Sequence, residues 1–440
     1  MVLINCSKID LDLKTTSSNF HSFIMPPINS VNHRLHGKEP HIVGLTLLSG
    51  FAAMGAILMT PALPVIAQYF KISVALTQLT VTSFLLGYAL GQLIYGPIAN
   101  RLGRKPAFYI GIAIATLGSL FSILASPIES FHLLIIGRLL EALGSSAGLV
   151  VCFTLINDFY YPKEARRVTG MMMVAFAIVP GVAIAIGGLL TQYLSWQACF
   201  YFLLFYGLVL IYPAIRMPET MSQADPHAFH YQHIFKKYGE IFLNKKLVGY
   251  ALCSGFSSAC IYVFGAEGPF IGIHLLHIAP ATYGLLGLTP FIGTLIGCLI
   301  NIRFTHIDSM HMLKLAFFLE LIAALIMLFS FIFHFISLTT LLLPMGLLCM
   351  GHPILSGTAL SLAMTQTEDR SNGSAVANFV AMSMPVVMTL LLGALHASAA
   401  WGLPLIFLIA LGLMLNVYIW LLKDNSQWSL LEKSNKVTEF

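Results

Sequence analysis

Long runs of apolar residues alternate with short polar links along most of the chain. Each run is about 20 residues or longer, the length that an α-helix needs to cross the hydrocarbon core of a bilayer. The twelve runs lie near residues 42–66, 74–96, 106–126, 130–153, 168–190, 195–215, 247–275, 280–302, 312–335, 337–362, 373–395 and 401–422. This pattern predicts an all-α membrane protein with twelve transmembrane helices.

The longest link, residues 217–246, separates six apolar runs from the other six. It interleaves lysines such as Lys236 and Lys237 with aromatic residues, which is typical of an amphipathic helix at a membrane surface. We therefore expect five parts: a polar cytoplasmic tail at 1–40, a six-helix half at 41–216, a cytoplasmic amphipathic linker at 217–246, a second six-helix half at 247–423 and a cytoplasmic tail at 424–440.

Basic residues lie almost entirely on one side of the predicted membrane. Of the 23 Lys and Arg residues, the succession of helices places 21 on the same side of the membrane, while Lys71 falls in a link on the other side and Arg138 lies inside a run. Loops rich in Lys and Arg face the cytoplasm, and an even number of helices then puts both termini there. The cations occur in small groups, so the formal net charge of +5 does not indicate a nucleic-acid-binding surface.

The overall composition excludes a soluble globular protein. The chain is 58% hydrophobic and 9% charged, with a mean hydropathy of +0.84, so most of its surface must face lipid. The seven cysteines show no metal-ligand spacing, and no phosphate-binding loop of the Gly-x-x-x-x-Gly-Lys-Ser/Thr type is present. We predict no cofactor, no bound metal and no enzymatic activity.

A short basic hinge, residues 96–105, joins the second and third apolar runs with the sequence Gly-Pro-Ile-Ala-Asn-Arg-Leu-Gly-Arg-Lys. It resembles the Gly-x-x-x-Asp-Arg-x-Gly-Arg-Arg/Lys signature of the major facilitator superfamily. Residues 78–92 of the preceding run are similar to the bicyclomycin-resistance branch of twelve-helix drug:proton antiporters. Asn100 stands where the family has an acid, and an amide cannot pair as a charge with Arg101 or Arg104.

The resemblance implies a fold of two pseudo-symmetric six-helix halves around a central cavity, working by alternating access. It also implies that the hinge latches the two halves on the cytoplasmic side. The fifth run resembles the antiporter motif of the family, which is thought to limit leak, although Ile184 replaces its second proline. The expected conformational residues are therefore Gly96, Asn100, Arg101, Gly103, Arg104, Lys105, Pro180, Gly187 and Gly188.

Two ionisable residues lie three positions apart in the fourth run, at Arg138 and Glu141. That spacing puts both on one helical face, and a charge inside a membrane must face a partner or water. The family pattern is Arg-x-x-Gln, so Arg138 matches and Glu141 departs from it. We expect Glu141, tuned by Arg138, to bind a proton or substrate; the alternative is a self-neutralised pair with a packing role.

Glu267 lies in the seventh run, where Gly265, Gly268 and Pro269 interrupt helix regularity. Freed backbone groups beside a carboxylate are features of a binding site between two halves. We therefore expect Glu267 to bind a proton or cation, against the alternative of a carboxyl group bonded to a neighbouring helix. Glu320, in the ninth run, is a weaker candidate because the third helix of each half lies peripherally in the family.

The first run lacks the acid that this branch of the family carries four residues before Pro61, since Ile57 occupies that position. Met54 and Met59 offer adaptable apolar contacts instead, although plain packing explains them equally well. His352 lies deep in the tenth run, where it either titrates near neutral pH or forms a structural hydrogen bond. The expected cavity residues are Met54, Ile57, Met59, Gln78 and His352.

These observations predict a monomeric secondary transporter in a bacterial inner membrane that exports a small amphipathic compound in exchange for protons. Arg138, Glu141 and Glu267 are the expected coupling residues. The missing acids at Ile57 and Asn100 keep a second possibility open, namely the uptake or exchange of a nutrient. A membrane enzyme or receptor would need a clustered nucleophile and base or a large soluble domain, and neither is visible in the sequence.

Overall fold

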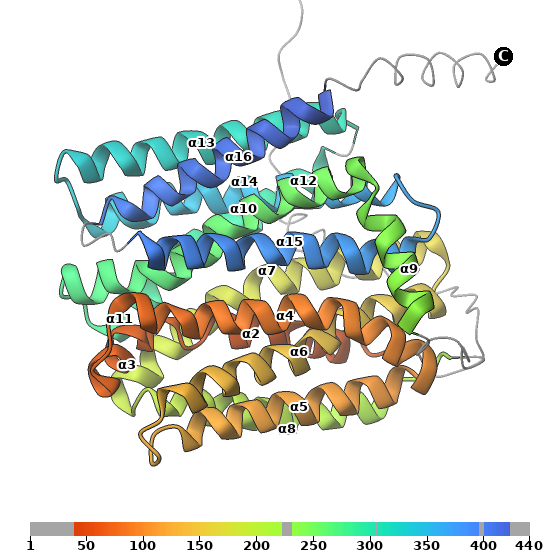
Figure 1. Cartoon of the computed structure of the whole chain (residues 1–440), viewed down its shortest axis with the longest axis horizontal. Coiled ribbons are helices and arrows are strands. Elements are labelled where there is room, and N and C mark those ends of the chain that lie inside the picture. The colour runs from red at the N-terminus through yellow and green to blue at the C-terminus, as the bar shows by residue number, and fades with distance from the viewer. Residues whose placement is uncertain (1–38, 222–230, 305, 396–399, 423–440) are drawn as a thin grey trace, which may run out of the picture.

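The computed structural model describes residues 39–221, 231–304, 306–395 and 400–422 (Figure 1). In this part of the chain, twelve helices are long and apolar enough to cross a membrane, so the all-α, twelve-helix prediction is confirmed. The first six crossings are formed by α2 (Ile42–Ile57) with η1 (Thr60–Ala62) and α3 (Leu63–Phe70), α4 (Val74–Leu102), α5 (Arg104–Leu124), α6 (Phe131–Phe159), α7 (Pro162–Tyr193) and α8 (Gln197–Arg216).

The short helix α9 (Tyr231–Phe242) lies between the sixth and seventh crossings. The last six crossings are formed by α10 (Lys245–Pro269) with the π-helical turn η2 (Phe270–Leu275), α11 (Pro280–Leu286) with α12 (Leu288–Arg303), α13 (Ser309–Ile332), α14 (Leu338–Met364), α15 (Arg370–Ala394) and α16 (Gly402–Leu422).

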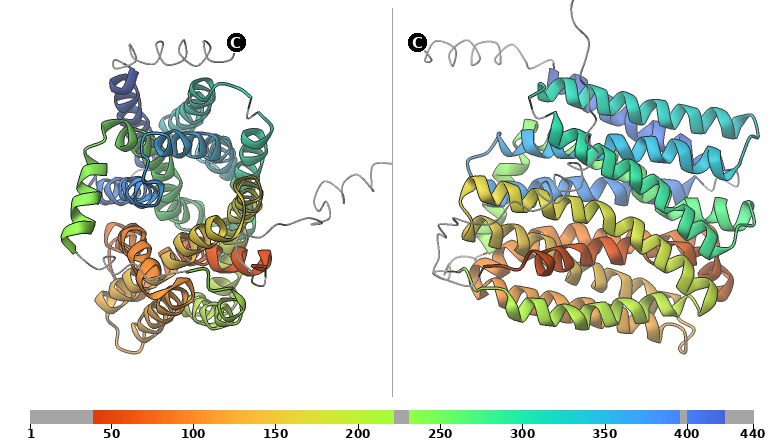
Figure 2. Two further views of the ribbon diagram at one scale, coloured as in Figure 1. Left: turned by 90° about the vertical axis from the view of Figure 1, so that its right-hand side faces the viewer. Right: turned by 180° about the vertical axis from the view of Figure 1, so that it is seen from behind.

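The first six crossings form one layer and the last six form another, and α4, α7 and α15 lie where the two layers meet (Figures 1 and 2). The described contacts between the halves are made chiefly by α4 with α15 and by α7 with α11 and α12. We call the end of the bundle that carries residues 96–105 the hinge end, and the opposite end the far end. Helix α9 lies at the hinge end and α3 at the far end (Figure 1).

Polar residues placed just before apolar runs fix where several helices begin. The side chains of Ser73, Ser130 and Asn244 accept hydrogen bonds from backbone N–H groups three residues later, at the starts of α4, α6 and α10. Ser337 and Thr340 form a reciprocal capping box at the start of α14. Each cap satisfies N–H groups that the helix itself leaves without acceptors.

Prolines interrupt the first crossing of each half. Pro61 and Pro64 fall where α2 ends, and the chain passes through the 3₁₀ turn η1 before it continues as α3. Pro269 ends α10, and the chain continues through η2. Proline removes a backbone donor and clashes with the preceding turn. The two interrupted crossings touch each other, because η1 packs on α10 and α3 packs on η2.

Helix α9 packs against the bundle, although the sequence suggested that it covers the membrane surface. Tyr238 and Ile241 are buried, and the Tyr238 hydroxyl donates to the Leu93 carbonyl oxygen of α4 over 3.0 Å. Phe242 packs edge-on against Phe379 of α15. Burial raises the pKa of Tyr238 to about 12, so its hydroxyl remains a donor at neutral pH. The linker helix therefore bridges the two halves at the hinge end.

Candidate functional site: a carboxyl group between the halves

The two interrupted crossings bring α10 against the first crossing, close to Glu267. A methyl group added to Gly265 would lie 3.8 Å from Thr60 Cγ2 and 3.9 Å from Ile57 Cδ1. Ile57, which stands where the family has an acid, therefore faces the second half with an apolar side chain. The N-terminal half lines this part of the interface without supplying a carboxylate at that position.

Glu267 forms a hydrogen bond across the interface between the halves. The side-chain amide of Gln78, on α4, donates from Nε2 to Glu267 Oε2 over 2.5 Å. Gln78 is 3% exposed, while Glu267 is only partly buried. Four residues along α4, the Thr82 hydroxyl donates to Thr389 Oγ1 of α15 over 3.0 Å. Two hydrogen bonds between side chains thus tie α4 to the C-terminal half.

A cavity of about 330 Å³ lies beside Glu267 near the far end. Gln78 and Glu267 line it together with Ser73, Phe270, His274 and Leu403. A second cavity of about 430 Å³, between α4 and α15, shares Gln78 with the first. The Glu267 carboxyl group is therefore next to open space as well as to the other half, a position from which it can exchange a proton or meet a ligand.

Arg138 and Glu141 form an ion pair in the interior of the N-terminal half. Both side chains are 0% exposed, and Arg138 Nη1 lies 3.1 Å from each carboxylate oxygen of Glu141. Arg138 Nη2 also donates to the Gly55 carbonyl oxygen over 2.9 Å, and the guanidinium lies 4.3 Å from the centroid of the Phe84 ring. The pair is thus neutralised locally and shielded from lipid.

The structure keeps this ion pair apart from Glu267, since no hydrogen bond or ion pair among the described residues joins them. Helix α4 connects the two sites. It places the Gln78 amide on Glu267 and, two residues later, the Thr80 carbonyl oxygen 3.4 Å from Arg138 Nε. The three predicted coupling residues therefore form two separate sites, on α6 and on α10, and α4 contacts both.

The remaining cavity candidates have different environments. Met54 and Met59 are 7% and 0% exposed and belong to the hydrophobic core. His352, on α14, is partly exposed, and its Nδ1 lies 2.9 Å from the Ser257 hydroxyl of α10. The described residues contain no group of three or more His, Cys, Asp and Glu side chains placed to hold a metal ion.

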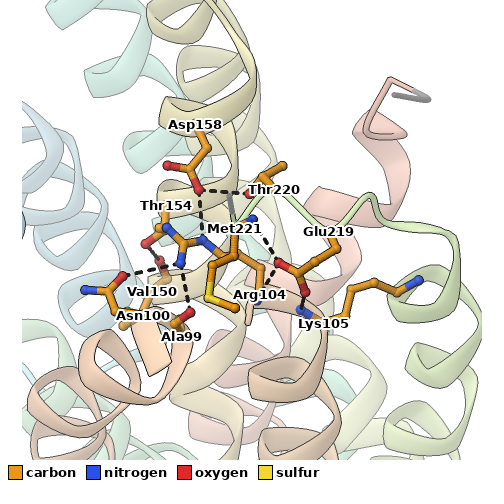
Figure 3. Close-up of polar contacts among 10 residues, drawn as sticks. All are labelled: Ala99, Asn100, Arg104, Lys105, Val150, Thr154, Asp158, Glu219, Thr220 and Met221. Atoms are coloured by element: carbon orange, nitrogen blue, oxygen red, sulfur yellow. Dashed lines mark hydrogen bonds and ion pairs between the residues drawn. The ribbon is translucent and has the colours of Figure 1, made fainter. Parts of the chain in front are cut away.

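The basic hinge is fixed by acids that lie outside the signature itself (Figure 3). Arg104 Nε donates to Asp158 Oδ2 of α6 over 2.8 Å, whereas its Nη1 reaches Asn100 Oδ1 only at 3.4 Å. The Glu219 carboxylate accepts hydrogen bonds from the backbone N–H groups of Arg104 and Lys105 at the start of α5. Asp158 thus supplies the negative charge that Asn100 lacks.

Gly103 makes this arrangement possible. Its φ of 111° lies in a region that residues with a side chain rarely adopt, and an added Cβ would lie 2.8 Å from Glu219 Oε2.

Gly96 has open space beside it, and Arg101 is partly buried. The hydrogen bonds described for Arg104 and Lys105 stay within the N-terminal half and the start of the linker, so they do not latch one half to the other in this conformation.

The glycine pair of α7 lies where helices cross closely. Gly187 faces the Leu58 carbonyl group of the first crossing, and Gly188 faces Pro280 and Gly284 of α11 in the other half. Pro180 lies inside α7 without ending it. Small residues let helix backbones approach within the distance of direct contact. The pair thus lets the two halves touch along α7 and α11.

Asp158, Glu219 and Ser257 are the residues near these sites that the sequence did not predict as site residues. Glu219 belongs to a Pro-Glu-Thr sequence that resembles the bicyclomycin-resistance group, and this was a signal for it. Asp158 and Ser257 had no such signal, because an acid near a helix end and serines inside a helix, here Ser254, Ser257 and Ser258, are common in membrane proteins.

Two six-helix halves, each beginning with an interrupted crossing, define the class of membrane transport proteins built from paired helical bundles. A family model described as "Major Facilitator Superfamily" matches residues 45–389, and the chain belongs to that family.

The names of similar proteins agree with this family assignment. An "Uncharacterized transporter" of Rickettsia bellii is 30% identical, over 80% of this chain and 88% of its own length. The "Bicyclomycin resistance protein homolog" of Haemophilus influenzae is 23% identical, over 81% and 88%. The "Multidrug resistance protein D" of Escherichia coli is 28% identical, over 73% and 79%. The resemblance to the bicyclomycin-resistance branch is therefore confirmed.

A solved structure confirms the fold. The xylose transporter XylE of Escherichia coli, in a partially occluded inward-open conformation, superimposes with a TM-score of 0.66 over 85% of this chain and 96% of its own. The sequence identity is 13%, so the likeness concerns the fold and not the substrate. The predicted major facilitator architecture of two six-helix halves is confirmed.

Proposed function

We propose that this transporter exports a small amphipathic compound in exchange for protons, by alternating access, across the inner membrane of a bacterium. The hinge end would face the cytoplasm, as the distribution of Lys and Arg predicts, with both termini on that side and the monomer as the working unit. The drug-resistance names of two relatives support an exported drug-like substrate.

The observation that carries the proposal is the hydrogen bond between Gln78 and Glu267. It joins the two halves near the far end, beside a cavity, and one of its partners changes charge when it binds a proton. An ionised carboxylate accepts two or more hydrogen bonds, whereas a neutral carboxylic acid is also a donor. Proton binding at Glu267 would therefore change how the halves hold each other, which is the requirement for coupling a proton to a conformational change.

The first crossing, residues 42–70, carries no charged residue that could bind a substrate. Ile57 is 5% exposed and Met54 is 7% exposed, and neither carries a charge that would select a cation. Glu267 is then the carboxyl group between the halves that binds the proton. A neutral amphipathic compound would not form an ion pair with it, so the compound and the proton need not compete for the carboxylate charge. We propose that Arg138 and Glu141 support this site through α4 and do not touch the substrate.

Nutrient uptake is the second candidate, and the apolar Ile57 at the usual acidic position is the observation that favours it. The direction of transport separates the two. In right-side-out membrane vesicles with an inside-alkaline pH gradient, a proton-coupled exporter lowers the internal level of a drug such as chloramphenicol when the gradient is applied. Accumulation of a nutrient under the same gradient, with drug levels unchanged, would support uptake and contradict export.

A further inference from the structure

A second ionisable site lies in the C-terminal half, and it is built from three helices. Glu320 of α13 and Ser257 of α10 are both 0% exposed. The Ser257 hydroxyl donates to Glu320 Oε1 over 2.5 Å, and the same hydroxyl oxygen lies 2.9 Å from His352 Nδ1 of α14. Since the hydroxyl gives its hydrogen to the carboxyl group, it accepts from Nδ1–H of the imidazole.

The Glu320 carboxyl group has a hydrogen-bond partner on only one of its oxygens, and no positive charge is paired with it among the described residues. Its Oε2 atom is buried and has no hydrogen-bond partner, and among the described residues no Lys or Arg forms an ion pair with it. Glu141, in the other half, has Arg138 beside it. An isolated ionised carboxylate is costly to bury in a membrane, whereas a neutral carboxylic acid costs far less.

The other titratable groups around Glu320 are not cations. Helix α10 contributes the Cys260 thiol and α14 contributes the Cys349 thiol and the His352 imidazole. Helix α16 also packs on α13, where its Tyr418 lines a pocket together with Lys314 of α13, and Glu320 does not line that pocket. His352 is thus the member of this set that can carry a proton to the carboxyl group.

We propose that Glu320 is a proton-binding site of the C-terminal half and that Ser257 and His352 connect it to the accessible surface. In the proposed step, Nε2 of the partly exposed imidazole takes a proton from water that reaches it, while Nδ1–H passes its proton to Ser257 Oγ. The serine hydroxyl proton moves to Glu320 Oε1 in the same step. One proton enters, one proton reaches the carboxyl group, and the imidazole ends neutral in its other tautomer.

This site is distinct from Glu267, although its use in transport rests on the proposed proton coupling. The test therefore measures proton binding directly, without substrate. Infrared difference spectra of the purified full-length protein in lipid nanodiscs, recorded between acidic and alkaline pH, should contain a C=O band of a protonated carboxyl group. We expect Glu320→Gln to remove one such band and Glu267→Gln to leave it in place.

The route is tested by the rate at which this band appears after a rapid drop in pH. We expect His352→Asn to slow it on the order of 100-fold, the lower end of what a positioned acid–base group contributes. His277→Asn serves as the control, because His277 is exposed and its φ of 53° suits asparagine. Ser257→Ala should shift the band frequency, since it removes the donor while leaving the carboxyl group.

A band that survives Glu320→Gln would overturn the site, and an unchanged rate in His352→Asn would overturn the route. If Glu320→Gln does not fold, an unshifted band in Ser257→Ala would overturn the site in its place. If the Glu320 band titrates as expected but no drug flux follows a pH gradient, the proposed function fails and the proton site stands.

Discussion

Arg138 and Glu141 illustrate what a buried charge requires inside a membrane helix bundle. The guanidinium is shared among the Glu141 carboxylate, the Gly55 carbonyl oxygen and the Phe84 ring, so its charge is offset on several sides. Burying two charges is expensive, but removing one partner is worse, because the other then stays in an apolar site with no compensation.

We predict that Arg138→Met and Glu141→Leu each destabilise the protein by about 3–5 kcal/mol. The double variant should recover much of that loss, because it leaves no charge behind. The comparison pair is Lys237 and Asp369, whose side chains are 44% and 41% exposed and whose charged atoms lie 3.8 Å apart. Lys237→Met should cost about 0–1 kcal/mol.

Unfolding of the purified variants in detergent, followed by tryptophan fluorescence, measures these differences. A double variant that is as unstable as the sum of the single variants would show that the two side chains do not act as a pair.

At the scale of single residues, the sequence predicted a functional role for Arg138, Glu141 and Glu267, because an ionisable group inside an apolar run is costly to bury. It did not predict that Glu267 bonds Gln78, 189 positions away, since no local pattern encodes which distant helix faces which. The same limit explains why Asp158 was missed as the partner of Arg104.

At the scale of helices, the apolar runs located the crossings well, and the breaks at Pro61 and Pro269 follow from the loss of a backbone donor. The linker helix α9 was the exception. Its amphipathic pattern is the same whether its apolar face meets lipid or protein, and only the positions of Leu93 and Phe379 show that protein covers it.

The glycines of α7 offer a test of close helix contact. We predict that Gly187→Ala lowers stability and transport, because an added methyl group would overlap the Leu58 carbonyl group. The matched control is Gly170→Ala on the same helix, where nothing lies within 4 Å of an added Cβ. There, replacing glycine in a helix should stabilise by about 0.5–1 kcal/mol.

The midpoint of thermal unfolding and the rate of drug efflux, measured side by side for Gly187→Ala and Gly170→Ala, test this prediction. Equal behaviour of Gly187→Ala and Gly170→Ala would mean that the crossing of α7 with the first helix tolerates a wider separation than the structure shows.

At the scale of the whole molecule, the hydrogen bonds between the halves gather near the far end. Besides Gln78 with Glu267 and Thr82 with Thr389, the Gln192 side chain of α7 accepts from the Ala281 backbone N–H of α11. At the hinge end, α9 bridges the halves through Tyr238. The alternating access that we propose requires that the bonds at the far end break during the transport cycle.

Two cysteines can test that requirement. The hydroxyl oxygens of Thr82 and Thr389 lie 3.0 Å apart, so Thr82→Cys/Thr389→Cys places two thiols close enough for a disulfide. Oxidation should abolish transport, and a reductant should restore it. Each single cysteine variant is the control for oxidation of the cysteines already in the chain. Full transport by the cross-linked protein would show that the halves do not separate there.

The central claim is that the Glu267 carboxyl group couples proton binding to movement of the two halves. The most direct test is drug flux in proteoliposomes, with and without a pH gradient, for the wild type, Glu267→Gln and the control Glu129→Gln, an exposed acid at the far end. We predict that the gradient accelerates flux in the wild type and the control but has no effect in Glu267→Gln. Flux in Glu267→Gln that responds to the gradient as in the wild type would contradict the claim.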